Sequence, residues 1–391
     1  SKYGSIKVDM PSKPVYSIYS WCSMLFAAGI GATILYWSTI EWIEYYNILK
    51  SDNLLIDYDS LLYARTYPIF HWGFTAWAIY CLPVIAFTLA ITKKPNSNLT
   101  FSGILNINNF ILRSILDVLF IGSIICAAGV GLGLSFPLIS SVISEIFTIE
   151  RSYILDISTI LLCSIIFATS AYVGVQRGIR KLSNINVILL IIFLFLILIL
   201  GPTKYIIANS FETVTFYITN YIDMSFTTGT IISLDWTVFY WAWWIAFAPF
   251  VGLFLARISR GRSIREFIVG AMLAPSLMCF IWITFAGGTA IDLELNGSAG
   301  GAILSAGQES QLFATLKLML SDGLMPIMSS LVVLLLLTYL VTSADSAVLI
   351  VNTINSGGDE SQKGHVHIVI WGVALTLVIA VLLIAGGMEA L

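Results

Sequence analysis

Long apolar stretches dominate the chain, and their recurrence predicts a series of membrane-spanning helices. Runs such as VILLIIFLFLILILG (187–201) and SSLVVLLLLTYLV (329–341) contain no charged residue. About 20 consecutive apolar residues are enough for a helix to cross the hydrocarbon core of a bilayer. We therefore predict nine spans, at residues 16–40, 68–92, 114–136, 154–175, 184–202, 236–256, 266–287, 325–349 and 365–387.

Composition gives the same picture and sets the fold class. The 391 residues are 58% hydrophobic and only 10% charged, whereas about a quarter of the residues in a soluble protein are charged. Lipid cannot satisfy an open strand edge, and the alternation typical of a membrane β-barrel is absent from the sequence. We expect an all-α integral membrane protein with a single transmembrane domain over residues 1–391. The five cysteines show no metal-ligand spacing and are interpreted as small core residues.

The charges between the spans predict how the chain is oriented in the membrane. Fourteen of the 19 Lys and Arg residues fall in alternate segments, at 1–14, 93–113, 176–186, 257–266 and 356–364. Cytoplasmic loops are enriched in Lys and Arg, so residue 1 is expected on the cytoplasmic side of the cell's inner (plasma) membrane. No basic tail or patch indicates nucleic-acid binding.

Three further segments have individual interpretations. Residues 203–222 are amphipathic and are expected to lie along the outer interface. Residues 288–322 form a predicted outer loop with a short helix near 310–320. The chain begins without methionine and stops at GGMEAL directly after its last span, which we interpret as a fragment of a longer protein.

Two aromatic clusters are the most distinctive chemical feature. WTVFYWAWW (236–244) contains four tryptophans, and at about 100° per helical residue Trp243, Trp244 and Phe247 share one face while Trp241 points nearly opposite. In HWGFTAWAIY (71–80), the side chains of Trp72, Trp77 and Tyr80 likewise share one side. Two such faces could enclose an uncharged cavity that attracts a quaternary ammonium by cation–π interaction. Packing or anchoring at the membrane interface is the alternative for each ring taken singly.

Small and hydroxyl residues suggest a cation site as well. Gly29 and Gly31 weaken the first span and favour a break that frees backbone carbonyls, although close helix packing would also explain them. Thr342 and Ser343 present adjacent hydroxyls, which can bind a hard cation or bond to their own helix. Asp345 is interpreted as an acid near the cytoplasmic end of its span.

Other polar groups receive plainer interpretations. Glu41 and Asp117 lie in or beside spans and are assigned structural roles. The arginine-rich loop 256–267 is interpreted as anchoring on the positive side, with gating or lipid contact as the alternative. The three histidines lack metal-ligand spacing, and no nucleophile–base set or phosphate loop is present, so we do not expect an enzyme or a cofactor.

Taken together, four motifs resemble the betaine/carnitine/choline transporter (BCCT) family. They are AAGIGATILYW (27–37), HWGFTAWAIY (71–80), DWTVFYWAWW…FLARISRGRSIREF (235–267) and VTSADSA (341–347). The similarity implies a LeuT-like inverted-repeat transporter that lacks the first two helices and the last one. The first repeat would cover residues 15–222 and the second, incomplete, residues 234–391. A homotrimer is implied in the same way.

The resemblance also implies roles for individual residues. Trp72, Trp77, Tyr80 and Trp244 match an aromatic box around a trimethylammonium group, and Trp243 and Phe247 match a neighbouring aromatic site. For sodium, the implied ligands are the carbonyls of Ala28 and Ile30 and the hydroxyls of Thr342 and Ser343. Thr33 stands where the family commonly has glycine, which bears on substrate choice and the coupling ion.

From these features we expect a secondary transporter that imports glycine betaine or a related quaternary-ammonium osmolyte by sodium symport. A sodium-independent exchanger of carnitine type and a carrier of choline or dimethylsulfoniopropionate are the alternatives within transport. A channel, or an osmosensor that binds its ligand without moving it, is the alternative from another class.

Overall fold

The computed structural model describes residues 3–8, 13–29, 33–51, 58–93, 100–105, 107–133, 135–226, 234–357 and 365–386, and over these ranges the chain is helical without a β-strand. In the first half the helices are α1 (Ile18–Gly29), α2 (Thr33–Ser51), α3 (Tyr58–Trp72), α4 (Phe74–Lys93), α5 (Phe101–Ile104), α6 (Phe110–Gly133), α7 (Ser135–Phe147) and α8 (Tyr153–Leu200). The second half contains α9 (Thr203–Phe226), α10 (Leu234–Ile258), α11 (Ile264–Trp282), the π-helical turn η1 (Ile283–Gly287), α12 (Gly288–Leu295), the 3₁₀ turn η2 (Gln308–Ser310), α13 (Gln311–Met319), α14 (Met325–Asn355) and α15 (His365–Gly386).

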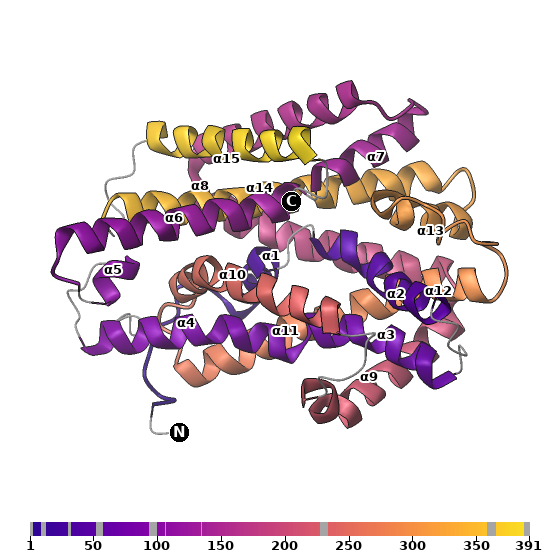
Figure 1. Cartoon of the computed structure of the whole chain (residues 1–391), viewed down its shortest axis with the longest axis horizontal. Helices are drawn as coiled ribbons and strands as arrows, with labels where there is room; N and C mark the ends of the chain where they lie inside the picture. Colours follow the sequence, from indigo (N-terminus) through magenta and orange to yellow (C-terminus); the bar gives the residue numbers. More distant parts are fainter. Residues whose placement is uncertain are drawn as a thin grey trace.

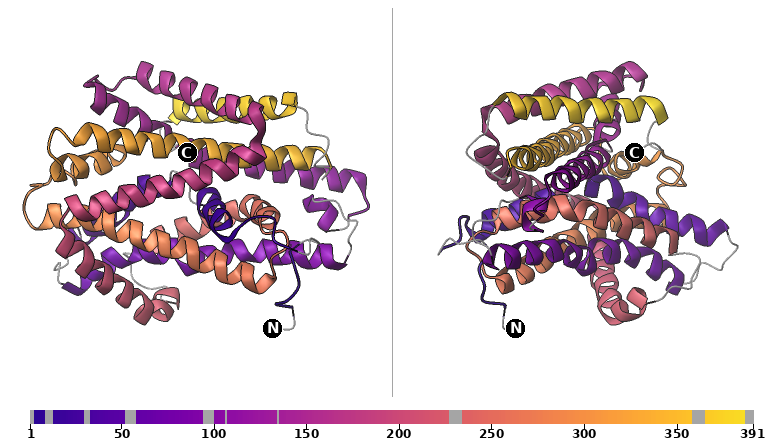
Figure 2. Two further views of the ribbon diagram at one scale, coloured as in Figure 1. Left: turned by 180° about the vertical axis from the view of Figure 1, so that it is seen from behind. Right: turned by 60° about the vertical axis from the view of Figure 1, so that its left-hand side comes forward.

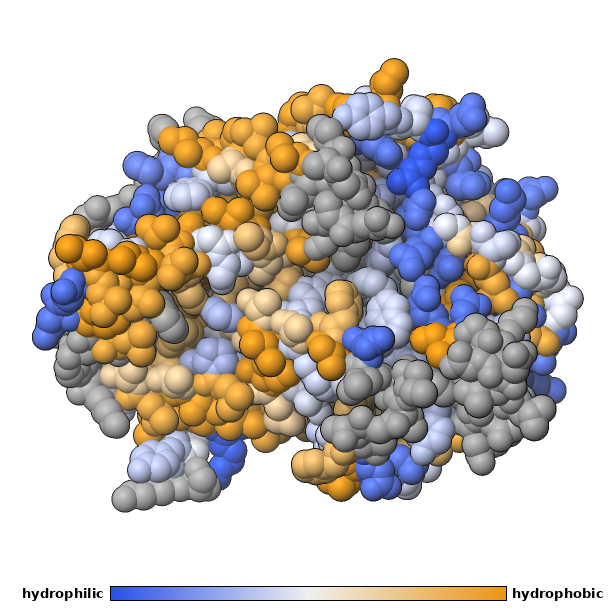
Figure 3. All heavy atoms as spheres, in the orientation of Figure 1, coloured by the Kyte–Doolittle hydropathy of each residue, from blue (hydrophilic) through white to orange (hydrophobic). Residues whose placement is uncertain are grey.

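Long apolar helices form the body of the molecule and lie side by side along its longest axis (Figure 1). Six helical stretches of the described chain are long and apolar enough to cross a membrane: Leu61–Ala90, Phe110–Phe147, Gly178–Leu200, Asp235–Ile258, Ile264–Leu295 and Met325–Asn355. Shorter apolar helices at Ile18–Ala27, Tyr153–Ile166 and Val369–Val381 fall in the three remaining predicted spans. Hydrophobic side chains cover much of the face in Figure 3. The predicted all-α membrane fold is confirmed.

The first predicted span contains α1, described to Gly29, and the start of α2, described from Thr33. The predicted break falls between them and stays a prediction. Ile30 and Gly31 lie outside the described residues. Helix α2 then continues to Ser51, beyond the predicted end of the span at residue 40.

Two other boundaries differ from the prediction. Residues 176–186, predicted as a loop, are helical and join the fourth and fifth spans into the single 48-residue helix α8. This segment contains Arg, Lys and Leu but no proline, so nothing in its covalent structure prevents a helix. Figure 2 shows that the two arms of α8 run in different directions. The seventh span also continues past residue 287, because η1 connects α11 to α12 without a break.

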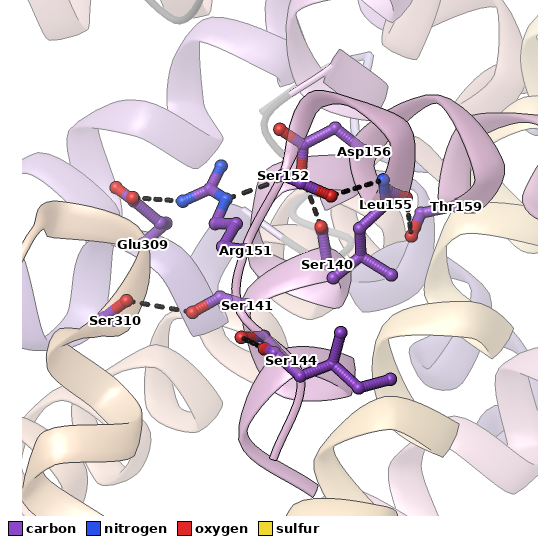
Figure 4. Close-up of polar contacts among 11 residues, drawn as sticks. Ser140, Ser141, Ser144, Arg151, Ser152, Leu155, Asp156, Thr159, Glu309 and Ser310 are labelled. Atoms are coloured by element: carbon purple, nitrogen blue, oxygen red, sulfur yellow. Dashed lines mark hydrogen bonds and ion pairs between the residues drawn. The ribbon is translucent and has the colours of Figure 1, made fainter. Parts of the chain in front are cut away.

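The predicted outer loop is held by a polar cluster, drawn in Figure 4. Its short helix is present as α13. Arg151 lies between Glu309 and Asp156 and forms ion pairs with both, while the hydroxyls of Ser141 and Ser310 are 2.9 Å apart. The end of this loop is thereby fixed to the segment that joins α7 to α8.

The arginine-rich loop is fixed by the start of the chain. Backbone bonds of 2.8 Å join Val8 N–H to the Arg262 carbonyl and Ile264 N–H to the Ile6 carbonyl. The Arg262 guanidinium stacks 4.0 Å from the centroid of the Trp21 ring, and only 5% of Arg262 is exposed. This arginine therefore packs into the protein, which the anchoring interpretation did not anticipate.

Helices α4 and α10 approach closely at a glycine. A Cβ atom on Gly252 would lie 2.5 Å from Cγ of Pro83, which is too close for two carbon atoms. Both helices carry aromatic residues of the predicted clusters, so this contact fixes how near those rings come to one another.

Replacing Gly252 with alanine is expected to lower the free energy of unfolding by about 1–3 kcal/mol, because α4 and α10 must move apart to admit the methyl group. The measurement is the melting temperature of the purified protein in detergent. Gly122→Ala on α6 is the matched control, since its added methyl group has nothing within 4 Å. Equal melting temperatures for the two variants would contradict the prediction.

Candidate functional site

Aromatic side chains from three helices meet at one cavity within the helix bundle. Trp72 is the last residue of α3, Tyr80 lies on α4, and Trp243, Trp244 and Phe247 lie on one face of α10. Helix α10 packs against α4, α6 and α14 (Figure 1), so the cavity is enclosed by helices that are distant in sequence. All five rings line it.

The rings pack mainly edge to face or tilted. Centroids are 4.8 Å apart for Tyr80 and Trp244, 5.5 Å for Trp72 and Trp244, and 6.0 Å for Trp72 and Trp243. Phe247 extends the row, with its centroid 5.9 Å from that of Trp243. An aromatic face carries negative potential, so a cavity walled by such rings attracts positive charge without containing a carboxylate.

Trp77 and Trp241 occupy different places. Trp77 is fully buried and packs behind the cavity wall, 5.7 Å from Tyr80 and 6.0 Å from Trp244 between ring centroids, but it does not line the cavity. Trp241 packs against Phe70 at 5.3 Å, on the other side of α10. The helical spacing therefore predicted correctly that Trp241 lies on a different face of α10 from the rings that line the cavity.

The remaining wall is small, apolar or hydroxylic. It comes from Ala128, Gly131 and Leu132 on α6, Ser135 on α7, Phe250 on α10, Leu340 and Ser343 on α14, and Thr33 at the start of α2. None of the described residues that line the cavity is charged. Gly131 lies against the ring of Phe247, where a Cβ atom would be 3.5 Å from Cζ. Thr33, singled out as a departure from the family pattern, faces the cavity.

The residues predicted to bind sodium are only partly described. Ile30 lies outside the described residues, and the side chain of Ala28 is not described although its backbone lies in α1. Ser343 lines the aromatic cavity, and Thr342 is fully buried beside it on α14. The end of α1 lies near this part of α14, because the ring centroids of Phe26 and Tyr339 are 6.2 Å apart.

Thr342 is joined to the second arm of α8. Its hydroxyl donates to the Thr338 carbonyl at 2.7 Å and accepts from Asn186 Nδ2 at 3.3 Å. The Asn186 Oδ1 atom is buried and has no hydrogen-bond partner in the described part of the chain. The sequence analysis missed Asn186, because a lone asparagine at the start of an apolar span has no distinctive spacing.

Asp345 is buried among the helices, which its interpretation as an acid near the cytoplasmic end of the span did not anticipate. It is fully buried, and its Oδ2 accepts from the Ser170 hydroxyl at 2.7 Å, on the first arm of α8. Helix α14 continues to Asn355 instead of ending at 349, which places Asp345 well inside it. Asp117 does have the predicted structural role, since it accepts from the backbone and hydroxyl of Ser102 and thereby fixes α5.

A buried acid–imidazole pair adjoins the aromatic cavity. Nδ1 of His71 lies 2.5 Å from Oε1 of Glu41, and the indole N–H of Trp72 donates to Oε2 of Glu41 at 3.2 Å. The sequence analysis noticed each residue separately but not the pair, because Glu41 and His71 lie 30 residues apart on different helices.

An uncharged aromatic cavity between membrane helices is the kind of pocket in which a small molecule binds. Comparison with known proteins is more specific. The sequence matches the betaine/carnitine/choline family transporter (BCCT) description over residues 1–391. The chain belongs to this family, as the four motifs predicted.

Several relatives are similar over most of their length. The glycine betaine transporter OpuD of Bacillus subtilis (strain 168) is 34% identical over 403 residues, covering 100% of this chain and 77% of that protein. The ectoine/hydroxyectoine transporter of Virgibacillus pantothenticus is 34% identical over 404 residues, covering 100% of this chain and 79% of its own length. A carnitine transporter of Acinetobacter baumannii is 32% identical over 294 residues, covering 73% of this chain and 53% of that protein.

These findings establish a multi-pass protein of the inner membrane that transports osmolytes of the betaine type and is not an enzyme. The side of the membrane on which residue 1 lies stays a prediction from the loop charges.

Proposed function

We propose that this protein imports glycine betaine, or a related quaternary-ammonium osmolyte, by sodium symport. The aromatic cavity would hold the trimethylammonium group, and Na⁺ would bind between α1 and α14. The observation that carries the proposal is the set of six aromatic side chains, Phe250 included, around an uncharged cavity.

The chemistry of the cavity favours a zwitterionic onium compound. Each aromatic face contributes about 0.5–2 kcal/mol to binding a cation, and several faces act together here. A carboxylate in the wall would repel the acid group of a betaine, and the described lining residues include none. The hydroxyls of Thr33, Ser135 and Ser343 supply hydrogen-bonding groups that do not add charge.

Sodium coupling is supported by oxygen atoms on α14 and α8, near the end of α1. Hydroxyl and carbonyl oxygens are the ligands that hard cations prefer. The Thr342 hydroxyl donates a hydrogen bond to the Thr338 carbonyl and accepts one from Asn186, which leaves one oxygen lone pair for another contact. Asn186 Oδ1 is a further buried oxygen beside it. The implied ligands remain Ala28, Ile30, Thr342 and Ser343.

Transport would follow alternating access in a LeuT-like fold. The proposed repeats, 15–222 and 234–391, would move relative to each other around the central cavity, opening it to one side and then to the other. The region where the two arms of α8 meet is a place where such movement could occur. Assembly as a homotrimer remains an expectation from the family resemblance.

The alternative transporters differ from a sodium symporter of betaine in the coupling ion or counter-substrate that uptake requires, or in the substrate itself. A carnitine-type exchanger needs a counter-substrate inside the cell instead of Na⁺, and a choline or dimethylsulfoniopropionate carrier uses the same rings for another onium compound. The absence of Lys and Arg from residues 182–200 favours sodium, because a basic side chain in this span replaces sodium in exchangers of the family.

The first test is the uptake of labelled glycine betaine by cells that lack their own carriers and express this protein, in Na⁺ and in K⁺ buffer. Accumulation is expected in Na⁺ only, because the coupling ion drives transport against the gradient. Uptake independent of Na⁺ would contradict symport and favour exchange. Absence of betaine uptake in both buffers would contradict the proposed substrate.

Trp244→Leu is expected to raise the KM for glycine betaine about tenfold, since it removes one cation–π contact and opens the packing around the box. Trp241→Leu is the matched control, because it makes the same change on the other side of α10 and should have a much smaller effect. The measurement is the KM of uptake in saturating Na⁺. Equal effects of the two substitutions would contradict the assigned binding face.

Replacing both Thr342 and Ser343 with alanine is expected to increase the Na⁺ concentration for half-maximal uptake by about tenfold or more, because two hydroxyl ligands are lost. Thr338→Ala, one turn earlier on α14, is the control, since its hydroxyl donates to the Leu334 and Leu335 carbonyls of its own helix. The measurement is the sodium dependence of uptake at fixed betaine. An unchanged sodium dependence in the double variant would remove these hydroxyls from the site.

A further inference from the structure

The contact between Glu41 and His71 is a buried acid–base pair inside the membrane region. Both side chains have 0% exposure, and Oε1 of Glu41 lies within hydrogen-bonding distance of Nδ1 of His71, at 2.5 Å. A lone carboxylate is costly in such a place, so its charge requires a partner within the protein. His71 is in direct contact and can supply that charge.

Both oxygens of Glu41 and both nitrogens of His71 have assigned contacts. Oε1 faces Nδ1 of His71, Oε2 accepts from Nε1 of Trp72, and Nε2 of His71 lies 2.9 Å from the Thr237 hydroxyl. The network therefore joins α2, α3 and α10. It ends on the indole of Trp72, a ring that lines the cavity.

The other groups around the pair are aromatic. Tyr240 stacks on the His71 ring with centroids 4.6 Å apart, and the rings of Tyr67 and Tyr45 lie at 5.7 Å and 6.4 Å. Phe70 and Trp241 complete the surroundings at 5.5 Å and 5.7 Å. Tyrosine is neutral near pH 7, so these rings separate the pair from water without changing its net charge.

We infer that Glu41 and His71 form a buried ion pair that positions Trp72 in the onium box and, because its two charges balance, keeps the box from favouring a net cation over a zwitterion. This inference rests on the proposed function of the cavity and identifies what sets its substrate class. Glu41 and His71 are positioning residues, because they act through the Trp72 ring. The sequence analysis gave Glu41 only a structural role.

The charge argument has two opposite consequences. If the pair loses its positive member, the remaining carboxylate attracts a net cation such as choline and repels the carboxylate of glycine betaine. If the pair loses its negative member, the attraction for choline falls. A purely structural role for the pair would instead weaken the binding of both substrates together.

Two near-isosteric substitutions separate these consequences. In His71→Asn, the amide can still donate to Glu41 Oε1 but cannot carry a positive charge. In Glu41→Gln, the side chain keeps its shape but loses its charge, and its single oxygen can accept from only one of the two facing N–H groups. Glu44→Gln is the matched control on the same helix, because Glu44 accepts from Gln308 and an amide oxygen can do the same.

The measurement compares the KM for glycine betaine uptake with the Ki of choline as its competitor, at saturating Na⁺. We expect the ratio of Ki to KM to fall about threefold or more in His71→Asn and to rise about threefold or more in Glu41→Gln, since a charge at this range acts through a partly screening medium. Glu44→Gln should keep the wild-type ratio. Shifts of both constants by one common factor, or an unchanged ratio in both variants, would overturn the inference.

The double variant Glu41→Gln/His71→Asn tests the balance of charge directly. It carries no charge at either position, so its ratio is expected within about twofold of the wild type. If a single variant does not fold in the membrane, the double variant is still expected to fold there and to keep the ratio of Ki to KM within about twofold of the wild type. A double variant that does not fold, or that has a different ratio, would overturn the inference.

Failure of the proposed function gives a different result. It would appear as absence of betaine uptake by the wild type, whereas failure of the inference would appear as wild-type uptake with unaltered selectivity in the variants. Without uptake, titration of the purified proteins with tetramethylammonium, followed by tryptophan fluorescence, tests the same effect. Affinity for this cation must then rise in His71→Asn and fall in Glu41→Gln, and any other order would overturn the inference.

Discussion

The close packing of α10 against α3 and α4 is the contact on which the site depends. Gly252 lets α10 lie directly against Pro83, and the aromatic faces of the two regions then meet at ring spacings of 4.8–6.0 Å. Trp244 touches both Trp72 and Tyr80, so one residue of α10 locates the cavity relative to the rest of the bundle. If these helices lay farther apart, the same rings would no longer enclose a cavity.

Polar groups inside the membrane follow a second constraint. Water is scarce there, so a buried charge is costly unless it has a partner in the protein. Asp345 meets Ser170, Glu41 meets His71 and Trp72, and Arg65 on α3 is joined to Glu212 and Asn209 on α9. Each of these contacts links two different helices. Polar contacts therefore help to specify which helices are neighbours.

Local patterns in the sequence predicted the features that arise within one helix. Periodicity placed Trp243, Trp244 and Phe247 on one face of α10 and Trp241 on the other, because the face that a residue occupies follows from helical geometry. The motif resemblance identified the family, which the match over residues 1–391 establishes.

The features that were missed depend on tertiary contacts or on where a helix ends. No periodicity relates Glu41 to His71, or Asn186 to Thr342, since their pairing requires that two helices lie side by side. The burial of Asp345 was not anticipated, because its contact with Ser170 requires that α14 and α8 lie side by side. The loop at 176–186 was predicted from its basic residues, yet Arg and Lys are also good helix formers.

Helix α8 contacts one stretch of α14 from both of its arms. Ser170 on the first arm bonds to Asp345, and Asn186 on the second arm bonds to Thr342, one turn of α14 away. If α14 slid along its axis, both bonds would break together, and either arm could swing away only by releasing a buried polar group. Intermediate positions would leave those groups unsatisfied in a medium without water, so they are unfavourable. The two hydrogen bonds thus hold α14 in one register against both arms of α8.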